Sequence, residues 1–230
     1  MLYDPSRLKA VLFDMDGVLF DSMKNHATAW HEAMRHYGMQ MSREEAYLHE
    51  GRTGAGTINI VSLRERGREA TDEEIKAIYQ TKSEVFNSLP TAERMPGAYE
   101  LLCKVKACGL VPMVVTGSGQ TSLLERLEHN FPGIFRRELM VTAFDVKFGK
   151  PHPEPYLMAL QKAAVGPDEA IVVENAPLGV RAGVAAGIFT VAVNTGPLPD
   201  EVLLSEGAGR LFRSMNEFCE NWEKFFPAIQ

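Results

Sequence analysis

The sequence predicts an α/β protein with a doubly wound (Rossmann-like) parallel sheet core and an inserted all-helical cap domain. Three observations support this prediction. Short apolar runs alternate with amphipathic helical segments over most of the 230 residues. These runs are rich in Val, Ile and Leu without strict alternation, which is typical of parallel strands that are buried on both faces. Residues 22–89 break this rhythm, because they show helical periods and no convincing strand.

Five apolar segments are the predicted strands: Lys9–Phe13, Leu110–Val115, Leu139–Thr142, Ala170–Val173 and Phe189–Val193. Pro112 has no amide hydrogen to give to a sheet, so the second strand is expected to start close to it. The segments between the strands show helical periodicity, and their alternation with strands implies right-handed crossovers in an open sheet. The predicted helices are Tyr99–Cys108, Gln120–His129, Pro153–Ala164 and Pro177–Ala186. Cys103 and Cys108 are interpreted as core residues, since free cysteine is usually buried.

The helical segment defines the predicted domain boundaries. Residues 22–89 are expected to form the cap domain, and residues 1–21 and 90–230 the α/β core. Asp72–Phe86 predicts a long polar helix, and an apolar stripe predicts a shorter one. That stripe consists of His26, Trp30, Ala33, Met34 and Tyr37. The boundary between two such domains is a common place for a small-molecule site.

Composition limits the possible partners. The net charge of −6 argues against nucleic acid or an anionic membrane surface, because both attract a basic face. The three cysteines form neither a disulfide framework nor a zinc pattern. No segment reaches the ~18 apolar residues that a membrane span needs, and Met1–Lys9 has no apolar signal region. We therefore expect a cytoplasmic enzyme for a small metabolite, either a monomer or a weak homo-oligomer.

The first predicted strand ends in a pair of carboxylates. Asp14 and Asp16 are two positions apart and are followed by Gly17, where the chain can turn sharply. Because ligands of an open parallel sheet bind beyond the carboxyl ends of its strands, this pair is a candidate active site. A plain turn that uses the carboxylates for local hydrogen bonds is the alternative interpretation.

Polar residues follow three further strands. Thr116, Gly117 and Ser118 precede a predicted helix, where exposed amides can bind an anion and where Ser or Thr can instead be a simple helix cap. Lys150 lies just before the helix that starts near Pro153, so an anion is expected to compensate its charge there, and an ordinary solvated loop lysine is the alternative interpretation. Glu174 and Asn175 carry oxygen ligands suited to Mg²⁺, although Asn175 also fits an N-cap of the next helix.

The order of these motifs resembles the haloacid dehalogenase superfamily over essentially the whole chain. The matching stretches are DMDGVLFDS, VVTGSG, GKPHPEPYLMAL and VVENAPLGVRAGVAAG. The helical insert is similar to the cap of the β-phosphoglucomutase-like branch of phosphatases and phosphomutases. One position departs from the pattern: the fourth motif usually ends in aspartate, and here it has Asn175. This change removes a charge and predicts a weaker Mg²⁺ site.

The resemblance implies a mechanism and a set of roles. Asp14 is the nucleophile that forms an aspartyl-phosphate, and Asp16 protonates the leaving oxygen and then activates the acceptor. Thr116 donates a hydrogen bond to the phosphoryl group and Lys150 neutralises charge. Asp14, the Asp16 carbonyl, Glu174 and Asn175 are the implied Mg²⁺ ligands, with Gly117 and Ser118 beside the phosphate. In the cap, the implied substrate-side residues are His26, Arg52 and Lys82.

Two acceptors remain open for the phosphoryl group. Water gives a phosphatase for a small phosphorylated metabolite such as a sugar phosphate, whereas a second hydroxyl gives a β-phosphoglucomutase-type isomerase. The loop around Arg52 matches the mutase pattern only loosely, which favours hydrolysis. His26 also fits simple packing on the apolar stripe, and Lys82 also fits a solvated lysine. Dehalogenation and a non-catalytic binding role are less favoured alternatives, since the full set with Asp16 is present.

Overall fold

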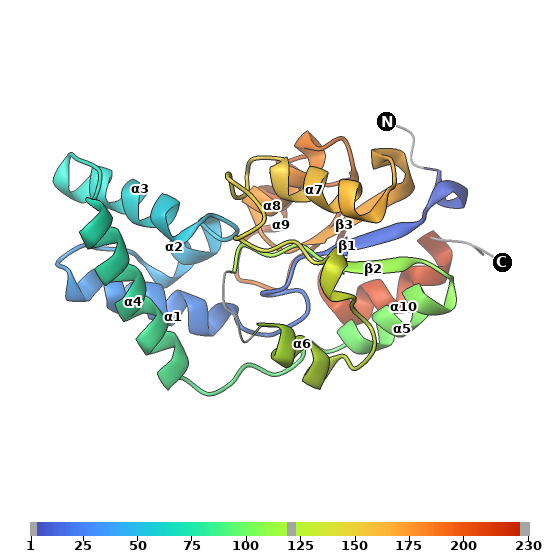
Figure 1. Cartoon of the computed structure of the whole chain (residues 1–230), viewed down its shortest axis with the longest axis horizontal. Coiled ribbons are helices and arrows are strands. Elements are labelled where there is room, and N and C mark those ends of the chain that lie inside the picture. The colour runs from blue at the N-terminus through green and yellow to red at the C-terminus, as the bar shows by residue number, and fades with distance from the viewer. Residues whose placement is uncertain (1–3, 119–122, 226–230) are drawn as a thin grey trace.

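The computed structural model describes residues 4–118 and 123–225, which form a sheet between two layers of helices with a helical unit at one end (Figure 1). The sheet is parallel throughout and has the strand order β2-β1-β3-β4-β5. The strands are β1 (Ala10–Phe13), β2 (Val111–Val114), β3 (Ala170–Glu174), β4 (Phe189–Val193) and β5 (Arg210–Phe212). The predicted doubly wound core is confirmed.

Helices cover both faces of the sheet. They are α5 (Ala98–Ala107), α6 (Leu123–Asn130), α7 (Glu154–Ala163), α8 (Pro177–Ala185), α9 (Asp200–Leu204) and α10 (Met215–Phe225). Val11 and Phe13 of β1 lie in the core shared with α5 and α10, whereas Ala10 and Leu12 lie in the core shared with α7 and α8. Alternate residues of a buried strand thus serve two apolar layers, which explains why its sequence is apolar throughout.

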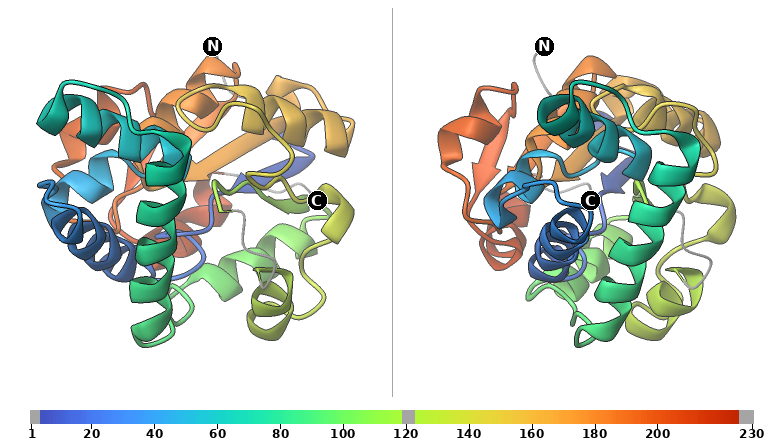
Figure 2. Two further views of the ribbon diagram at one scale, coloured as in Figure 1. Left: turned by 60° about the vertical axis from the view of Figure 1, so that its left-hand side comes forward. Right: turned by 90° about the vertical axis from the view of Figure 1, so that its left-hand side faces the viewer.

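Residues 22–89 contain four helices: α1 (Met23–His36), α2 (Arg43–Leu48), α3 (Gly54–Arg66) and α4 (Asp72–Ser88). The polar helix predicted from residue 72 is found, and it starts at a capping box between Thr71 and Glu74. The four helices surround an apolar cluster of their own that includes Met34, Ile58 and Ile78. This group, which we call the helical unit, lies beyond the carboxyl ends of the strands (Figures 1 and 2).

One predicted strand is absent from the structure, and one observed strand was not predicted. Leu139–Thr142 is not a strand: a 3-10 turn covers Arg137–Leu139, and only Val141 pairs with the sheet, through one bridge to Val115. The chain leaves the sheet there because the Asp145 carboxylate accepts hydrogen bonds from the amide and hydroxyl of Thr142. The edge strand β5 was not predicted, since it has three residues and begins with an exposed arginine.

The other predictions about local structure are confirmed in part. Pro112 is the second residue of β2, as its missing amide requires. The helix predicted over Gln120–His129 is found as α6 from Leu123, and residues 119–122 lie outside the described residues. Cys103 is exposed, so its interpretation as a core residue is wrong, and Cys108 is partly buried. Within the described residues, no helix is long and apolar enough to cross a membrane.

Candidate active site

The register of the sheet brings the predicted strand ends together. Phe13 of β1 pairs with Val114 on one side and with Val173 on the other. The residues that follow these three therefore emerge side by side at the carboxyl edge of the sheet, with Asp14 in the middle. Lys150 reaches the same edge from the loop before α7.

Lys150 is buried between two carboxylates. Its Nζ lies 2.5 Å from Oδ1 of Asp14 and 2.6 Å from Oε1 of Glu174, and it also donates to the Val115 carbonyl at 3.0 Å. Burial raises the pKa of Asp14 to about 8, and the positive charge of Lys150 only partly opposes this effect. Burial alone would lower the pKa of Lys150, but the two carboxylates raise it above its usual value. The expected anionic compensation of Lys150 is confirmed.

The Asp16 carboxylate points toward α1. Its Oδ1 accepts a hydrogen bond from the Ser22 hydroxyl at 2.5 Å and lies 3.2 Å from Nε2 of His26. Burial alone would raise the pKa of Asp16, but His26 and Ser22 hold it below its usual value. Asp16 is therefore an ionised acceptor that links the core to the helical unit.

A lysine of α4 completes this link. Lys82 is only 4% exposed, and its Nζ lies 2.9 Å from Nδ1 of His26. Aromatic rings of Trp30, Tyr79 and Phe86 surround the ammonium group. Burial lowers the pKa of Lys82 to about 8, and burial and Lys82 together lower that of His26. The interpretation of Lys82 as a solvated lysine is wrong, and that of His26 as a packing residue is incomplete.

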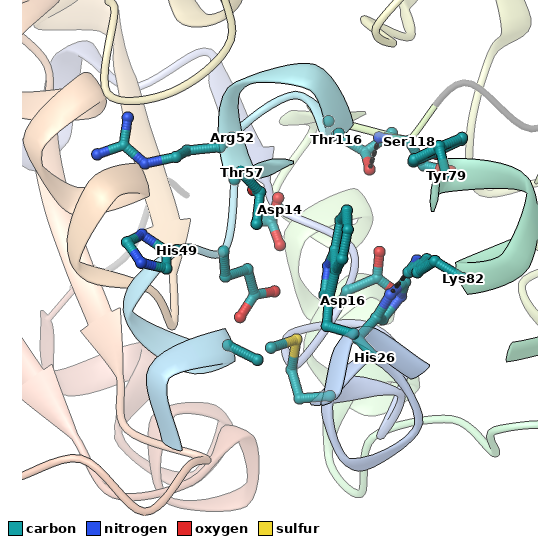
Figure 3. Close-up of a pocket in the computed structure, with 17 residues that line it drawn as sticks. Asp14, Asp16, His26, His49, Arg52, Thr57, Tyr79, Lys82, Thr116 and Ser118 are labelled. Atoms are coloured by element: carbon teal, nitrogen blue, oxygen red, sulfur yellow. Dashed lines mark hydrogen bonds and ion pairs between the residues drawn. The ribbon is translucent and has the colours of Figure 1, made fainter. Parts of the chain in front are cut away.

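The loop after β2 closes another side of the site. Thr116 is buried, and its Oγ1 accepts a hydrogen bond from the Ser118 amide at 3.1 Å, which leaves the hydroxyl hydrogen available as a donor. A Cβ atom on Gly117 would lie 3.3 Å from the Gly51 carbonyl, so the loop and the helical unit approach closely here. Arg52 follows Gly51, but its guanidinium points away from Asp14 (Figure 3).

The Glu174 carboxylate has a partner at each oxygen. Oε1 accepts from Lys150 and from the Tyr156 hydroxyl at 2.7 Å, and Oε2 accepts from the amides of Asn175 and Ala176. Asn175 does not cap the following helix, because the N-cap of α8 is Ala176 and no side chain caps it. The capping interpretation of Asn175 is therefore wrong.

Glu50 is a site residue that the sequence did not reveal. It comes from the helical unit, and its Oε2 accepts a hydrogen bond from Nδ2 of Asn175 at 3.3 Å. Burial raises the pKa of Glu50 well above its usual value, and the charges of Asp14 and Asp16 add to the shift. A single acid in a helical insert has no distinguishing pattern, and only the packing of the insert against the core brings it to the site.

These groups fit a hard cation. Oε1 of Glu50 and Oδ1 of Asn175 are buried without a hydrogen-bond partner, although native buried oxygens are nearly always paired. Within the described residues, no three His, Cys, Asp or Glu side chains hold a metal-binding geometry by themselves. The donor set is instead mixed, with carboxylate oxygens of Asp14 and Glu50 beside an amide oxygen, which are ligands that Mg²⁺ accepts.

The site surrounds a cavity of about 80 Å³ between the sheet edge and the helical unit. Asp14, Asp16, Thr116 and Ser118 line it from the core, and His26, Tyr79 and Lys82 line it from α1 and α4 (Figure 3). A phosphoryl group that binds in this cavity would therefore contact both the core and the helical unit.

Comparison with known proteins gives concordant matches. The family model of haloacid dehalogenase-like hydrolases matches residues 11–193. Hexitol phosphatase A of Escherichia coli (strain K12) is 35% identical over 190 residues, covering 82% of this chain and 84% of the relative. Fructose-1-phosphate phosphatase YqaB of the same strain is 30% identical, with 81% and 97% covered. The structure of a Bacteroides vulgatus protein named as a candidate beta-phosphoglucomutase is 70% identical, with 97% and 90% covered and a TM-score of 0.94.

Proposed function

Because the chain belongs to the haloacid dehalogenase-like hydrolase family, we propose that it is a Mg²⁺-dependent phosphatase that passes a phosphoryl group from a small metabolite to Asp14 and then to water. The chain is an enzyme, either a phosphatase or a phosphomutase. The observation that carries the proposal is the buried contact between Asp14 and Lys150 at the tip of β1. The names of the two phosphatase relatives support a sugar phosphate or a similar small phosphate ester as the substrate.

In the first proposed step, an Asp14 oxygen forms a bond to phosphorus while the bond to the leaving oxygen breaks. That leaving oxygen takes a proton from Asp16. In the second step, water loses a proton to Asp16 and attacks phosphorus, which restores the Asp14 carboxylate. Asp16 is ionised before substrate binds, and a phosphate dianion next to it would raise its pKa and favour the protonated form.

Charge cancellation makes the approach of Asp14 possible. Lys150 donates to Asp14 already, and Thr116 has a hydroxyl hydrogen free for a phosphoryl oxygen. Bound Mg²⁺ would screen the phosphoryl charge, and Asp14, Glu50, Asn175 and the Asp16 carbonyl are the groups proposed to hold it. Phosphoryl transfer depends mainly on such positioning and charge stabilisation.

Hydrolysis is favoured over isomerisation because the positive groups around the cavity are not available to bind a second phosphate. A mutase has to bind a sugar with two phosphoryl positions, which calls for a second anion site on the side opposite Asp14. The lysine on that side, Lys82, is engaged with His26, and the guanidinium of Arg52 points away. These contacts support water as the acceptor.

We also propose that residues 22–89 act as a cap domain. Their separate apolar cluster and their contribution to the cavity support this role. The cytoplasmic location expected from the sequence stays a prediction.

Phosphorus NMR tests this function. The purified protein with Mg²⁺ is incubated with phosphates of increasing size, from inorganic pyrophosphate and glycerol phosphate to fructose 1-phosphate and β-glucose 1-phosphate. We expect inorganic phosphate as the product, and no release by Asp14→Asn. Conversion of β-glucose 1-phosphate into the 6-phosphate would show a mutase instead. Phosphate release by Asp14→Asn at the wild-type rate would contradict the role of Asp14.

A further inference from the structure

Tyr156 is a buried polar side chain that the proposed mechanism does not use. It lies on α7, six residues after Lys150, and its relative exposure is 0%. Its hydroxyl donates to Oε1 of Glu174 at 2.7 Å. A tyrosine hydroxyl that is buried normally needs such a partner, but here the partner is the carboxylate that also holds Lys150.

The groups around Glu174 hold its carboxylate in a single position. Oε1 accepts two hydrogen bonds, from Tyr156 and Lys150, and Oε2 accepts two amide hydrogen bonds. Gly179 of α8 packs directly against the group, since a Cβ atom there would lie 1.9 Å from Oε1. The carboxylate therefore has no free face for a further ligand or for rotation.

Lys150 is equally constrained. An ammonium group has three hydrogens, and Nζ of Lys150 lies within hydrogen-bond distance of three oxygens, those of Asp14, Glu174 and Val115. The same Nζ lies 5.1 Å from the ring centroid of Tyr156. The position of the ammonium relative to Asp14 thus depends on where Glu174 is held.

We propose that Tyr156 is a positioning residue, which holds Glu174 in place so that Glu174 anchors Lys150 against Asp14 and does not ligate the metal. This inference rests on the proposed function, in which Lys150 cancels charge at Asp14. Without the Tyr156 hydroxyl, the charge on Oε1 has Lys150 as its remaining partner, and the ammonium shifts from Asp14 toward Glu174. Burial and the Glu174 charge raise the pKa of Tyr156 well above its usual value, so the hydroxyl keeps its hydrogen.

The variant Tyr156→Phe tests this role. Loss of a hydrogen bond to a charged group predicts a kcat about tenfold to a hundredfold lower. KM changes by less than about threefold, because substrate contacts are kept. Mg²⁺ affinity, measured by calorimetry without substrate, stays at the wild-type value. Tyr99→Phe is the matched control, because Tyr99 lies on α5 beside Arg94, away from the site. It is expected to leave kcat unchanged.

A double-mutant cycle tests the route through Glu174. If Tyr156 acts through this carboxylate, the kcat of the double variant Tyr156→Phe/Glu174→Gln should be less than about twofold below that of Glu174→Gln alone. A full additional loss, a wild-type kcat for Tyr156→Phe, or a large loss of Mg²⁺ affinity would each overturn the proposal. Activity that survives Asp14→Asn would instead remove the proposed function, so the two failures are distinguishable.

A measurement on the wild-type protein covers the case in which the Phe variant does not fold. Proton NMR with labelled tyrosine should show a hydroxyl proton of Tyr156 that exchanges slowly with water and shifts in Glu174→Gln. A hydroxyl proton that exchanges rapidly, or one that Glu174→Gln leaves unshifted, would contradict the hydrogen bond on which the proposal depends.

Discussion

At the scale of single residues, Asn175 and Glu50 form one unit. The sequence motif is usually completed by an aspartate where this chain has Asn175, so the core supplies one negative charge less. Glu50, from the helical unit, lies against Asn175 and carries a carboxylate into the same place. The two unpartnered oxygens of this pair are the strongest sign of a cation between the core and the helical unit.

The pair predicts opposite effects of two substitutions. Glu50→Gln should weaken Mg²⁺ binding roughly tenfold to a hundredfold, because it removes a charge from the donor set. Asn175→Asp should strengthen binding more in the Glu50→Gln background than alone, because in the wild type the new carboxylate would repel Glu50. Calorimetric titration with Mg²⁺ checks both. Equal affinities in all four proteins would exclude the pair from the metal site.

The sequence predicted most of the core side of the site and part of its cap side, where His26 and Lys82 line the cavity. Asp14, Asp16, Thr116 and Lys150 follow apolar strands, and strand ends of a parallel sheet meet at one edge, so their convergence was predictable. Glu50 and Tyr156 were not predicted. Their roles depend on how helices pack against the sheet, and periodicity indicates only which face of a helix is buried.

At the scale of elements, helices α1 and α4 carry the link from Asp16 through His26 to Lys82. Lys82 lies among three aromatic rings, so its charge is buried at a cost in stability. Lys76 lies on the exposed side of the same helix. The helix therefore offers one buried lysine and one exposed lysine for comparison.

The pH dependence of stability should reveal the buried charge. The pKa of Lys82 is about 8 in the folded protein, below its usual value of 10.5, because the ammonium group is buried. Below pH 8 the folded and unfolded states both bind the proton, so the penalty of roughly 3 kcal/mol is fully present. Between pH 8 and 10.5 the unfolded state binds more protons, so unfolding free energy rises with pH. The stability gain of Lys82→Met over wild type should therefore shrink across this range.

Urea denaturation at pH 7 and pH 10 measures this difference, with Lys76→Met as the matched control. A stability difference between Lys82→Met and wild type that is the same at both pH values would contradict a buried, charged Lys82. A difference for Lys76→Met that changes as much would show that the effect does not depend on burial.

Helix α8 gives a second prediction at this scale. Gly→Ala in an open helix position stabilises a protein by up to about 1 kcal/mol. At Gly179 the new Cβ atom would overlap the Glu174 carboxylate, so we expect Gly179→Ala to destabilise by about 1–3 kcal/mol and to lower kcat. Thermal unfolding and phosphate release check this. A more stable and fully active variant would show that the carboxylate can move.

Strands β1, β2, β3 and β4 were predictable because each is an apolar run bounded by polar residues. The segment after α6 was also apolar, yet it makes a single bridge to the sheet, since Asp145 draws the chain into a turn. Edge strand β5 was missed because it is not a clear apolar run: its sequence is short, begins with a polar residue and faces solvent on one side.

At the scale of the whole molecule, the candidate active site lies between the sheet edge and the helical unit, and each supplies part of it. The core brings the proposed nucleophile Asp14 and Lys150, whereas the helical unit brings Glu50 and the groups that hold Asp16. The proposed chemistry therefore uses groups from both parts of the chain, which meet where Gly117 closely approaches Gly51.

The most direct test asks whether the carboxylate of Asp14 receives the phosphoryl group. The protein with Mg²⁺ is mixed with a substrate identified by phosphorus NMR, quenched in acid within one turnover, digested and analysed by mass spectrometry. We predict a phosphorylated peptide that contains Asp14, which disappears as turnover is completed and is missing in Asp14→Asn. Phosphate release without a covalent intermediate, or with the phosphoryl group on another residue, would contradict the proposed mechanism.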